Sequence, residues 1–234
     1  MKLLAIDTSG PVCGVAVLAD GAVLYEQAVS NRLTHSANLL PMIDAALTAS
    51  GLTLADMDRL ACVTGPGSFT GVRIGVSTLK GLAHGCGKPC VGVDALEAMA
   101  AGIGGFDGLV VPLQDARAGQ VYAAAFTVEN GTPARVLADQ PISVAELAAL
   151  LPSLGERFLF LGDGMPVHRA RLTELLGDRA VFAAPQHAFL RPAAVAALAE
   201  KSPEELDYRA LMPMYLRAPN AERNKKLVEA AEHA

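Results

Sequence analysis

Two separate stretches of this chain repeat the same order of apolar runs, acidic residues and turns. The first copy comprises, in order, apolar residues 3–6, Asp7, apolar residues 12–18, Asp20-Gly21 and apolar residues 22–28. The second comprises residues 109–113, Asp115, residues 121–127, Asn130-Gly131 and residues 134–137. Asp-Gly and Asn-Gly favour two-residue hairpin turns, because these residues tolerate a positive φ. The repeat predicts a duplicated unit of three strands.

Each predicted strand triplet is followed by alternating helices and strands. After the first come a helix from Thr34 or Ser36 to Ala49, a strand at 60–63, a helix at 68–84, a strand at 91–93 and a helix at 96–101. After the second come a helix at 144–151, a strand at 158–161, a helix at 167–176, a strand at 180–183 and a helix at 192–200. We expect an α/β protein with duplicated βββ-α-β-α lobes and a cleft between them. The expected lobes are 1–104 and 105–216, followed by a tail at 217–234.

This duplication resembles the actin-like ATPase (ASKHA) fold, which sugar kinases and Hsp70 share. In those proteins, carboxylates at two strand ends face a nucleotide phosphate and its Mg²⁺. Asp7 and Asp115 occupy the equivalent places, and Gly162-Asp163-Gly164 is a candidate turn for contacting a nucleotide. Asp7, Asp115, Gly162 and Gly164 are therefore candidate cofactor-binding residues. The alternative is that each aspartate only forms the turn that follows its strand.

Charge argues against autonomous binding of nucleic acid. The net charge is −5, and the neutralisation of phosphates requires several basic residues on one face. The densest basic cluster comprises Arg217, Arg223, Lys225 and Lys226, and it is followed by Glu229 and Glu232. That mixture is typical of a solvated helical tail.

The sequence also predicts a cytoplasmic protein with no membrane span, no structural metal and no disulfide. No apolar run approaches the roughly 20 residues that a membrane helix needs, and Asp7 interrupts any signal-peptide core. The spacing of Cys86 and Cys90 is not that of a zinc ribbon, and no two histidines have helical metal-binding spacing.

The glycine-rich segment 65–83 fits neither common nucleotide-binding fingerprint. No Gly-Lys-Ser/Thr follows Gly65 at the distance of a Walker A loop, and the other glycines miss the dinucleotide spacing by one residue. The spacing favours a tight strand-to-helix turn in which Ser68 or Thr70 caps the helix. The alternative is that the free N–H groups at this turn hold an anion.

The full amino-acid sequence of segment 65–83 is more specific than the spacing of its glycines. Together with Leu-Ala-Ile-Asp-Thr-Ser at 4–9 and the helix at 35–47, it closely resembles the TsaB (YeaZ) family of threonylcarbamoyladenosine biosynthesis proteins. The other matching motifs are Asp115-Ala116-Arg117, Gly162-Asp163-Gly164, and Tyr215-Leu216-Arg217 with Pro219 and Glu222. The resemblance covers nearly the whole chain, most strongly over 1–100 and more loosely over 130–190.

The resemblance implies a non-catalytic partner of TsaD, the paralogue that transfers threonylcarbamoyl to the tRNA adenosine next to the anticodon. In TsaD, a His-x-x-x-His pair binds metal in the helix after the strand equivalent to 91–93. Those histidines align with Ala95 and Met99 here, and neither side chain binds a hard divalent metal. We therefore expect no catalytic residues, no metal and no cofactor of the chain's own, although a nucleotide at the interface of the complex is compatible with this reading.

The expected partners are a TsaD-type transferase, a TsaE-type ATPase, a second copy of the chain when it is alone, and tRNA only through the complex. The surplus apolar surface of the helices 36–49 and 68–84 suggests that they form the interface. The predicted interface residues are Leu39, Leu40, Ile43, Leu47, Gly71, Gly75, Val76, Leu79 and Ala83. The alternative is that both helices are simply buried within their own lobe.

A second functional class remains open at this stage. The two aspartates and the Gly162-Asp163-Gly164 turn also suit a nucleotide-dependent small-molecule kinase or carbamoyltransferase of the same fold. Peptidase activity has no support, because no Ser/His/Asp or zinc constellation is present.

Overall fold

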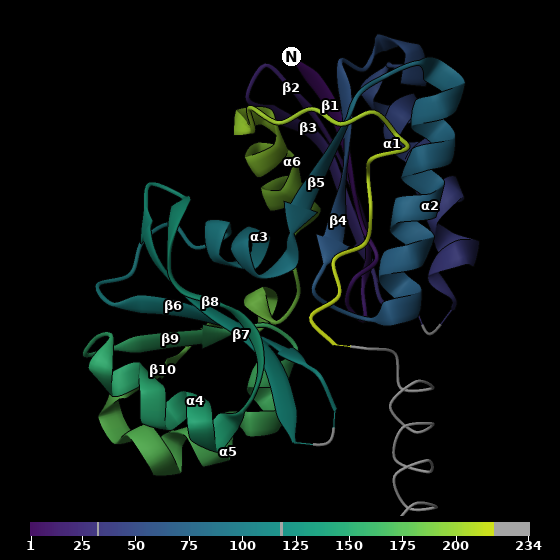
Figure 1. Ribbon diagram of the computed structural model, residues 1–234. Coiled ribbons are helices and arrows are strands. Elements are labelled where there is room, and N and C mark those ends of the chain that lie inside the picture. The colour runs from purple at the N-terminus through teal and green to yellow at the C-terminus, as the bar shows by residue number, and fades with distance from the viewer. Residues whose placement is uncertain (32, 118, 218–234) are drawn as a thin grey trace, which may run out of the picture.

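Two five-stranded mixed sheets form the frame of the molecule in the computed structural model, which describes residues 1–31, 33–117 and 119–217 (Figure 1). The first sheet contains β1 (Lys2–Asp7), β2 (Cys13–Ala19), β3 (Ala22–Val29), β4 (Arg59–Gly65) and β5 (Cys90–Asp94). The second contains β6 (Leu109–Asp115), β7 (Gln120–Glu129), β8 (Thr132–Ser143), β9 (Phe158–Leu161) and β10 (Ala180–Phe182).

The two sheets have the same topology. The orders are β3-β2-β1-β4-β5 and, written in the same direction, β8-β7-β6-β9-β10. In each sheet the first three strands are antiparallel, and the last two run parallel to the central strand. Both hairpin turns have positive φ, at Asp20 and Gly21 and again at Asn130 and Gly131. The predicted duplication and both predicted hairpins are confirmed.

Helices cover both faces of each sheet. The helices α1 (His35–Ser50) and α2 (Phe69–Cys86) share an apolar core with one face of the first sheet. In the same way, α4 (Val144–Leu150) and α5 (Gly164–Leu176) cover one face of the second. Among the described residues, four short 3₁₀ helices lie in the connections: Leu54–Asp56, Leu151–Ser153, Gly177–Arg179 and Pro185–His187.

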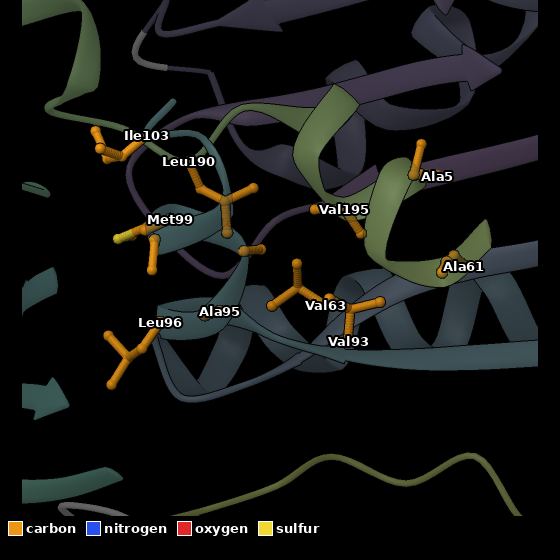
Figure 2. Packing of buried hydrophobic residues seen from close by; sticks show 14 of the residues in the cluster. Ala5, Ala61, Val63, Val93, Ala95, Leu96, Met99, Ile103, Leu190 and Val195 are labelled. Carbon is orange, nitrogen blue, oxygen red and sulfur yellow. The ribbon is translucent and has the colours of Figure 1, made fainter. Parts of the chain in front are cut away.

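The last helix of each lobe also contacts the sheet of the other lobe. The helix α3 (Ala95–Ala101) follows β5 but also packs against β6, β7 and β8, while α6 (Pro192–Lys201) follows β10 and packs against β1 and β2. Figure 2 shows Val195 of α6 among Ala5, Ala61, Val63 and Val93 of the first sheet, with Leu96 and Met99 of α3 further along the same cluster. One continuous core therefore joins the lobes.

The chain then runs back along the first lobe as an extended segment, residues 204–217 (Figure 1). Leu206 pairs with Cys90 at the edge of β5, and the N–H of Met214 donates to the carbonyl of Thr64. Leu211 is fully buried in the core under α2.

The predicted extent of the second lobe, 105–216, is therefore wrong for residues 192–216, which pack on the first. An amphipathic helix pattern shows that 192–200 has a buried face, but it does not show which sheet covers that face. Of the predicted tail 217–234, Arg217 lies at the cleft, and residues 218–234 lie outside the described residues.

One strand differs strongly from its prediction. The structure extends β8 over Thr132–Ser143, whereas apolar residues predict only 134–137. It is an edge strand with a mostly exposed or half-buried face and two register shifts against β7, so its side chains do not alternate regularly. The other elements agree with the predictions to within a few residues at their ends.

Candidate functional site

A cavity of about 590 Å³ lies between the lobes, at the ends of the central strands β1 and β6. Most of its lining comes from five places: the turn after β1, the turn after β6, the loop that leads into α2, the turn before α5, and the extended segment at 214–217. A small side pocket adjoins it and is lined by Asp7, Gln114 and Asp163, among others.

The two strand-end aspartates form equivalent turns. The Asp7 carboxylate accepts a hydrogen bond of 2.8 Å from the N–H of Ser9, and the Asp115 carboxylate accepts one of 2.9 Å from the N–H of Arg117. Asp7 is buried, and burial raises its pKa despite the hydrogen bonds from Ser9. Asp115 is exposed and lines the large cavity. Both aspartates thus form the turn that follows their strand, and the structure also brings both to the cleft.

The predicted glycines Gly162 and Gly164 do not line the large cavity. A β-carbon on Gly162, where φ is +92°, would overlap the carbonyl oxygen of Leu113, and one on Gly164 would lie 3.3 Å from the N–H nitrogen of Asp115. Both glycines therefore let the turn before α5 pack closely on β6. That packing places Asp163, the residue between them, in the wall of the cavity.

Two polar groups in this wall lack partners among the described residues. Gln114 is 3% exposed, and neither atom of its amide has a hydrogen-bond partner. The Oδ1 atom of Asp163 is also buried without one. Burial, together with the charge of neighbouring Asp115, raises the pKa of Asp163 to about 6. Gln114 was not among the predicted site residues. The sequence does mark it, because it is a polar residue within the otherwise apolar strand β6.

The opposite wall is the start of α2. The Ser68 side chain accepts a hydrogen bond of 3.2 Å from the N–H of Gly71, which confirms the predicted cap. Tyr215 stacks on Phe69 with ring centroids 4.8 Å apart, and its hydroxyl accepts a 2.8 Å hydrogen bond from Nε of Arg73. The extended segment is thereby fixed against α2, where it lines the cavity.

Gly71 and Gly75 form a stripe of small residues on α2, but this stripe does not face a partner, as their predicted place in the interface requires. β-Carbons on Gly71 and Gly75 would overlap Thr8, in the turn after β1. The stripe therefore lets α2 approach its own sheet closely, not a partner helix.

Most of the predicted interface residues are buried inside the first lobe, which contradicts their assignment to an outer surface. The buried residues are Leu39, Ile43, Gly71, Gly75, Val76, Leu79 and Ala83. Leu47 is half-buried, and only Leu40, at 55% exposed, faces solvent. Two helices that lie side by side on one sheet need a wide apolar stripe to form their own core. The apolar surface of α1 and α2 that we assigned to a partner is therefore used to pack these helices on the first sheet.

Ala95 and Met99 lie on α3 in the core between the lobes and are 0% and 6% exposed. Within residues 1–31, 33–117 and 119–217, no group of three or more His, Cys, Asp or Glu side chains is arranged to hold a metal ion. The helices of this described part are all too short or too polar to cross a membrane.

The duplicated sheets, the exchanged helices and the polar cleft define a two-lobed protein of the actin-like class. A ROK hexokinase from Thermus thermophilus has this fold with a TM-score of 0.51 at 11% identity, over 86% of this chain and 99% of that one. YeaZ from Pseudomonas aeruginosa is much more similar, with a TM-score of 0.75 at 27% identity over 92% of this chain and 99% of that one.

Sequence comparisons give the family. The family model described as tRNA N6-adenosine threonylcarbamoyltransferase, TsaD, matches residues 28–230. The tRNA threonylcarbamoyladenosine biosynthesis protein TsaB of Bacillus subtilis is 35% identical over 95% of this chain and 96% of that protein. TsaB of Escherichia coli is 44% identical over 56% of this chain and 58% of that protein. The chain belongs to the TsaB family, as its motifs indicated.

Proposed function

We propose that this chain is a non-catalytic partner subunit in the biosynthesis of threonylcarbamoyladenosine on tRNA, and that it acts with a TsaD-type transferase. The observation that carries the proposal is the similarity to the TsaB of Bacillus subtilis over nearly the full length of both proteins. The acidic net charge supports contact with tRNA through the complex instead of by this chain alone.

The absence of catalysis by the chain itself is supported by α3. Ala95 and Met99, which align with the metal-binding histidines of the transferase, pack in an apolar core between the lobes. A hard divalent metal there would need oxygen or nitrogen donors, and the methyl group of Ala95 and the thioether of Met99 supply neither. The kinase or carbamoyltransferase alternative is not favoured, because the relative that matches 95% of this chain is a threonylcarbamoyladenosine biosynthesis protein.

The outer face of α1 is the surface we assign to the transferase. Its exposed residues are Ser36, Ala37, Leu40, Pro41, Asp44, Ala45, Thr48 and Ala49, and only one of these carries a charge. The neighbouring cationic side chains of α2 are engaged elsewhere: Arg73 with Tyr215, and Lys80 with the carbonyl of Leu211. A weakly charged helical surface of this kind suits a protein partner.

We further propose that this outer face pairs two copies of the chain when the transferase is absent, and that the transferase displaces the second copy. A TsaE-type ATPase then acts on the heteromeric complex in the cytoplasm. These assignments follow the family resemblance, and the low charge of the α1 face supports them.

The test is co-purification with the transferase, followed by tRNA modification with each subunit omitted in turn. Leu40→Arg places a charge in the proposed interface and is expected to abolish co-purification while leaving the thermal melt unchanged. Leu24→Arg is the matched control, because Leu24 is similarly exposed at 49% but lies on β3. Equal binding of the transferase by both variants would refute the assigned surface, and undiminished modification without this chain would refute the function.

A further inference from the structure

We propose that the cavity between the lobes binds a small zwitterion, an amino acid or a short peptide with free termini. Its ammonium group would lie against Asp115, Asp163 and Gln114, and its carboxylate against the start of α2 and Arg217. The proposal uses residues away from the outer face of α1, so it does not depend on the proposed function.

The side of the cavity formed by the second lobe is suited to a cation. Asp115 and Asp163 lie close enough for the charge of one to raise the pKa of the other. Among the described residues, neither carboxyl group forms an ion pair with a lysine or arginine within 4.0 Å. A carboxyl group that is largely buried and lies near a second carboxyl group favours a cationic ligand.

Gln114 distinguishes this part of the cavity from a simple patch of acidic residues. Gln114 is a lining residue of both the cavity and the side pocket, and within the described part of the chain its carbonyl oxygen and its NH₂ group are buried without a hydrogen-bond partner. Buried polar groups in folded proteins almost always have a partner. An ammonium group can donate to the Gln114 carbonyl while a carbonyl of the same ligand accepts from its NH₂ group.

The side formed by the first lobe is suited to an anion. Ser68, Phe69 and Thr70 line the cavity at the start of an 18-residue helix that has no acidic residue in its first turn. The first N–H groups of a helix have no acceptor within the helix, and its dipole attracts negative charge. Arg217 of the extended segment also lines the cavity and adds a positive charge, whereas Arg117 lies in the turn after β6, beside Asp115.

The size of the cavity sets the class of ligand. Its 590 Å³ is within the range of sites that enclose ligands larger than a metal ion or a single small anion. Asp115 and Asp163 belong to the second lobe and the start of α2 to the first, so a zwitterion that contacts both sides would bridge the lobes. Because such a ligand binds only the folded arrangement, it should also raise the melting temperature.

The experiment is calorimetry on the full chain with triglycine, N-acetyl-triglycine, triglycinamide and free glycine. We expect triglycine to bind and to raise the melting temperature, and we expect blocking of either terminus to weaken binding at least tenfold. Equal affinity for glycine would assign the site to amino acids, whereas preference for triglycine would assign it to peptides.

Two variants locate the ends of the ligand. Asp163→Asn should remove the preference for a free ammonium group, and Arg217→Gln should remove the preference for a free carboxylate. The matched controls Asp178→Asn and Arg171→Gln change exposed residues outside the cavity and should leave both preferences intact. Each variant is checked by a thermal melt, and Asp163 makes no side-chain cap to α5 that its substitution would remove.

No binding of any of the four compounds at millimolar concentration would overturn the proposal. Equal binding of the free and blocked peptides would also overturn it, because that result would show that the charges are not recognised. Co-purification with the transferase is measured in parallel, so failure of the ligand site is distinguishable from failure of the proposed function.

Discussion

The hydroxyl of Thr8 donates a hydrogen bond of 2.7 Å to the carbonyl oxygen of Gly71. This bond ties the turn after β1 to the first turn of α2, and it forms because Gly71 has no side chain to keep the two apart. It holds one wall of the cleft at a fixed distance from the strand end that carries Asp7.

Gly71→Ala is therefore expected to destabilise the chain. The added methyl group would overlap the carbonyl oxygen of Thr8, so the helix must shift, and overpacking of this kind typically costs about 1–3 kcal/mol. Denaturant unfolding measures the loss. Gly81→Ala on the same helix is the control: nothing lies within 4 Å of its added carbon, so it should be neutral or stabilise by up to about 1 kcal/mol. Equal effects of the two variants would contradict the close approach.

Val76→Glu combined with Leu79→Arg is expected to unfold the first lobe instead of selectively breaking an assembly. Both side chains are almost fully buried in the core beneath α2. A charge without a partner in such a core costs several kcal/mol, which is a large part of the stability of a typical domain. A circular dichroism melt checks this. If the double variant melts like the parent chain but no longer binds the transferase, Val76 and Leu79 belong to the interface after all.

A buried acidic cluster between α3 and β8 should make stability depend on pH. Burial and the neighbouring Asp139 raise the pKa of Asp94 to about 8 from its ordinary 3.8, although Arg135 lies 3.5 Å away. In the folded chain Asp94 thus keeps a proton that the unfolded chain loses near pH 4. Unfolding releases that proton, so the free energy of unfolding falls as pH rises from about 4 to about 8.

Asp94→Asn should remove this contribution, which reaches at most about 1.4 kcal/mol per pH unit. Asparagine resembles the protonated acid and still caps α3, where the Asp94 side chain accepts from the N–H of Glu97. The variant should match the parent chain near pH 4 and exceed its stability at pH 8. Urea unfolding across this range tests it, with the exposed Asp178→Asn as a control. Parallel pH profiles for Asp94→Asn and the parent would contradict a raised pKa.

The isolated chain is expected neither to turn over ATP nor to modify tRNA. Asp7→Asn and Asp115→Asn should then leave the activity of the reconstituted complex unchanged, because each carboxylate serves its own turn. Phosphate release and the modification assay test both statements. Steady hydrolysis of ATP by the chain alone, lost in either variant, would instead support the kinase or carbamoyltransferase reading, as would micromolar binding of Mg²⁺-ATP in calorimetry.

The duplication was predictable because it rests on local signals. Hairpin dipeptides and strand-end aspartates specify their own backbone geometry, and the turns at Asp20 and Asn130 have the predicted positive φ. The cap at Ser68 is another signal of this kind.

Features that depend on which surfaces meet were not predictable in the same way. The apolar stripes of α1 and α2 show that these helices bury a wide face, but not whether a sheet or a partner covers it. The sequence does not show whether Gly71 and Gly75 allow close packing of a partner helix or of Thr8 from the same chain. Gln114 lies in β6 and Asp163 in the turn between β9 and α5, and only the folded sheet places them in one wall.

The exchange of α3 and α6 also has a consequence for synthesis. The sheet of the second lobe is complete once Phe182 has been made, whereas the first sheet still lacks the helix that covers Ala5 and Ala61. On the ribosome, the half of the chain that emerges first is therefore the half that finishes folding last. Until α6 emerges, one apolar face of the nascent first sheet stays open to chaperones.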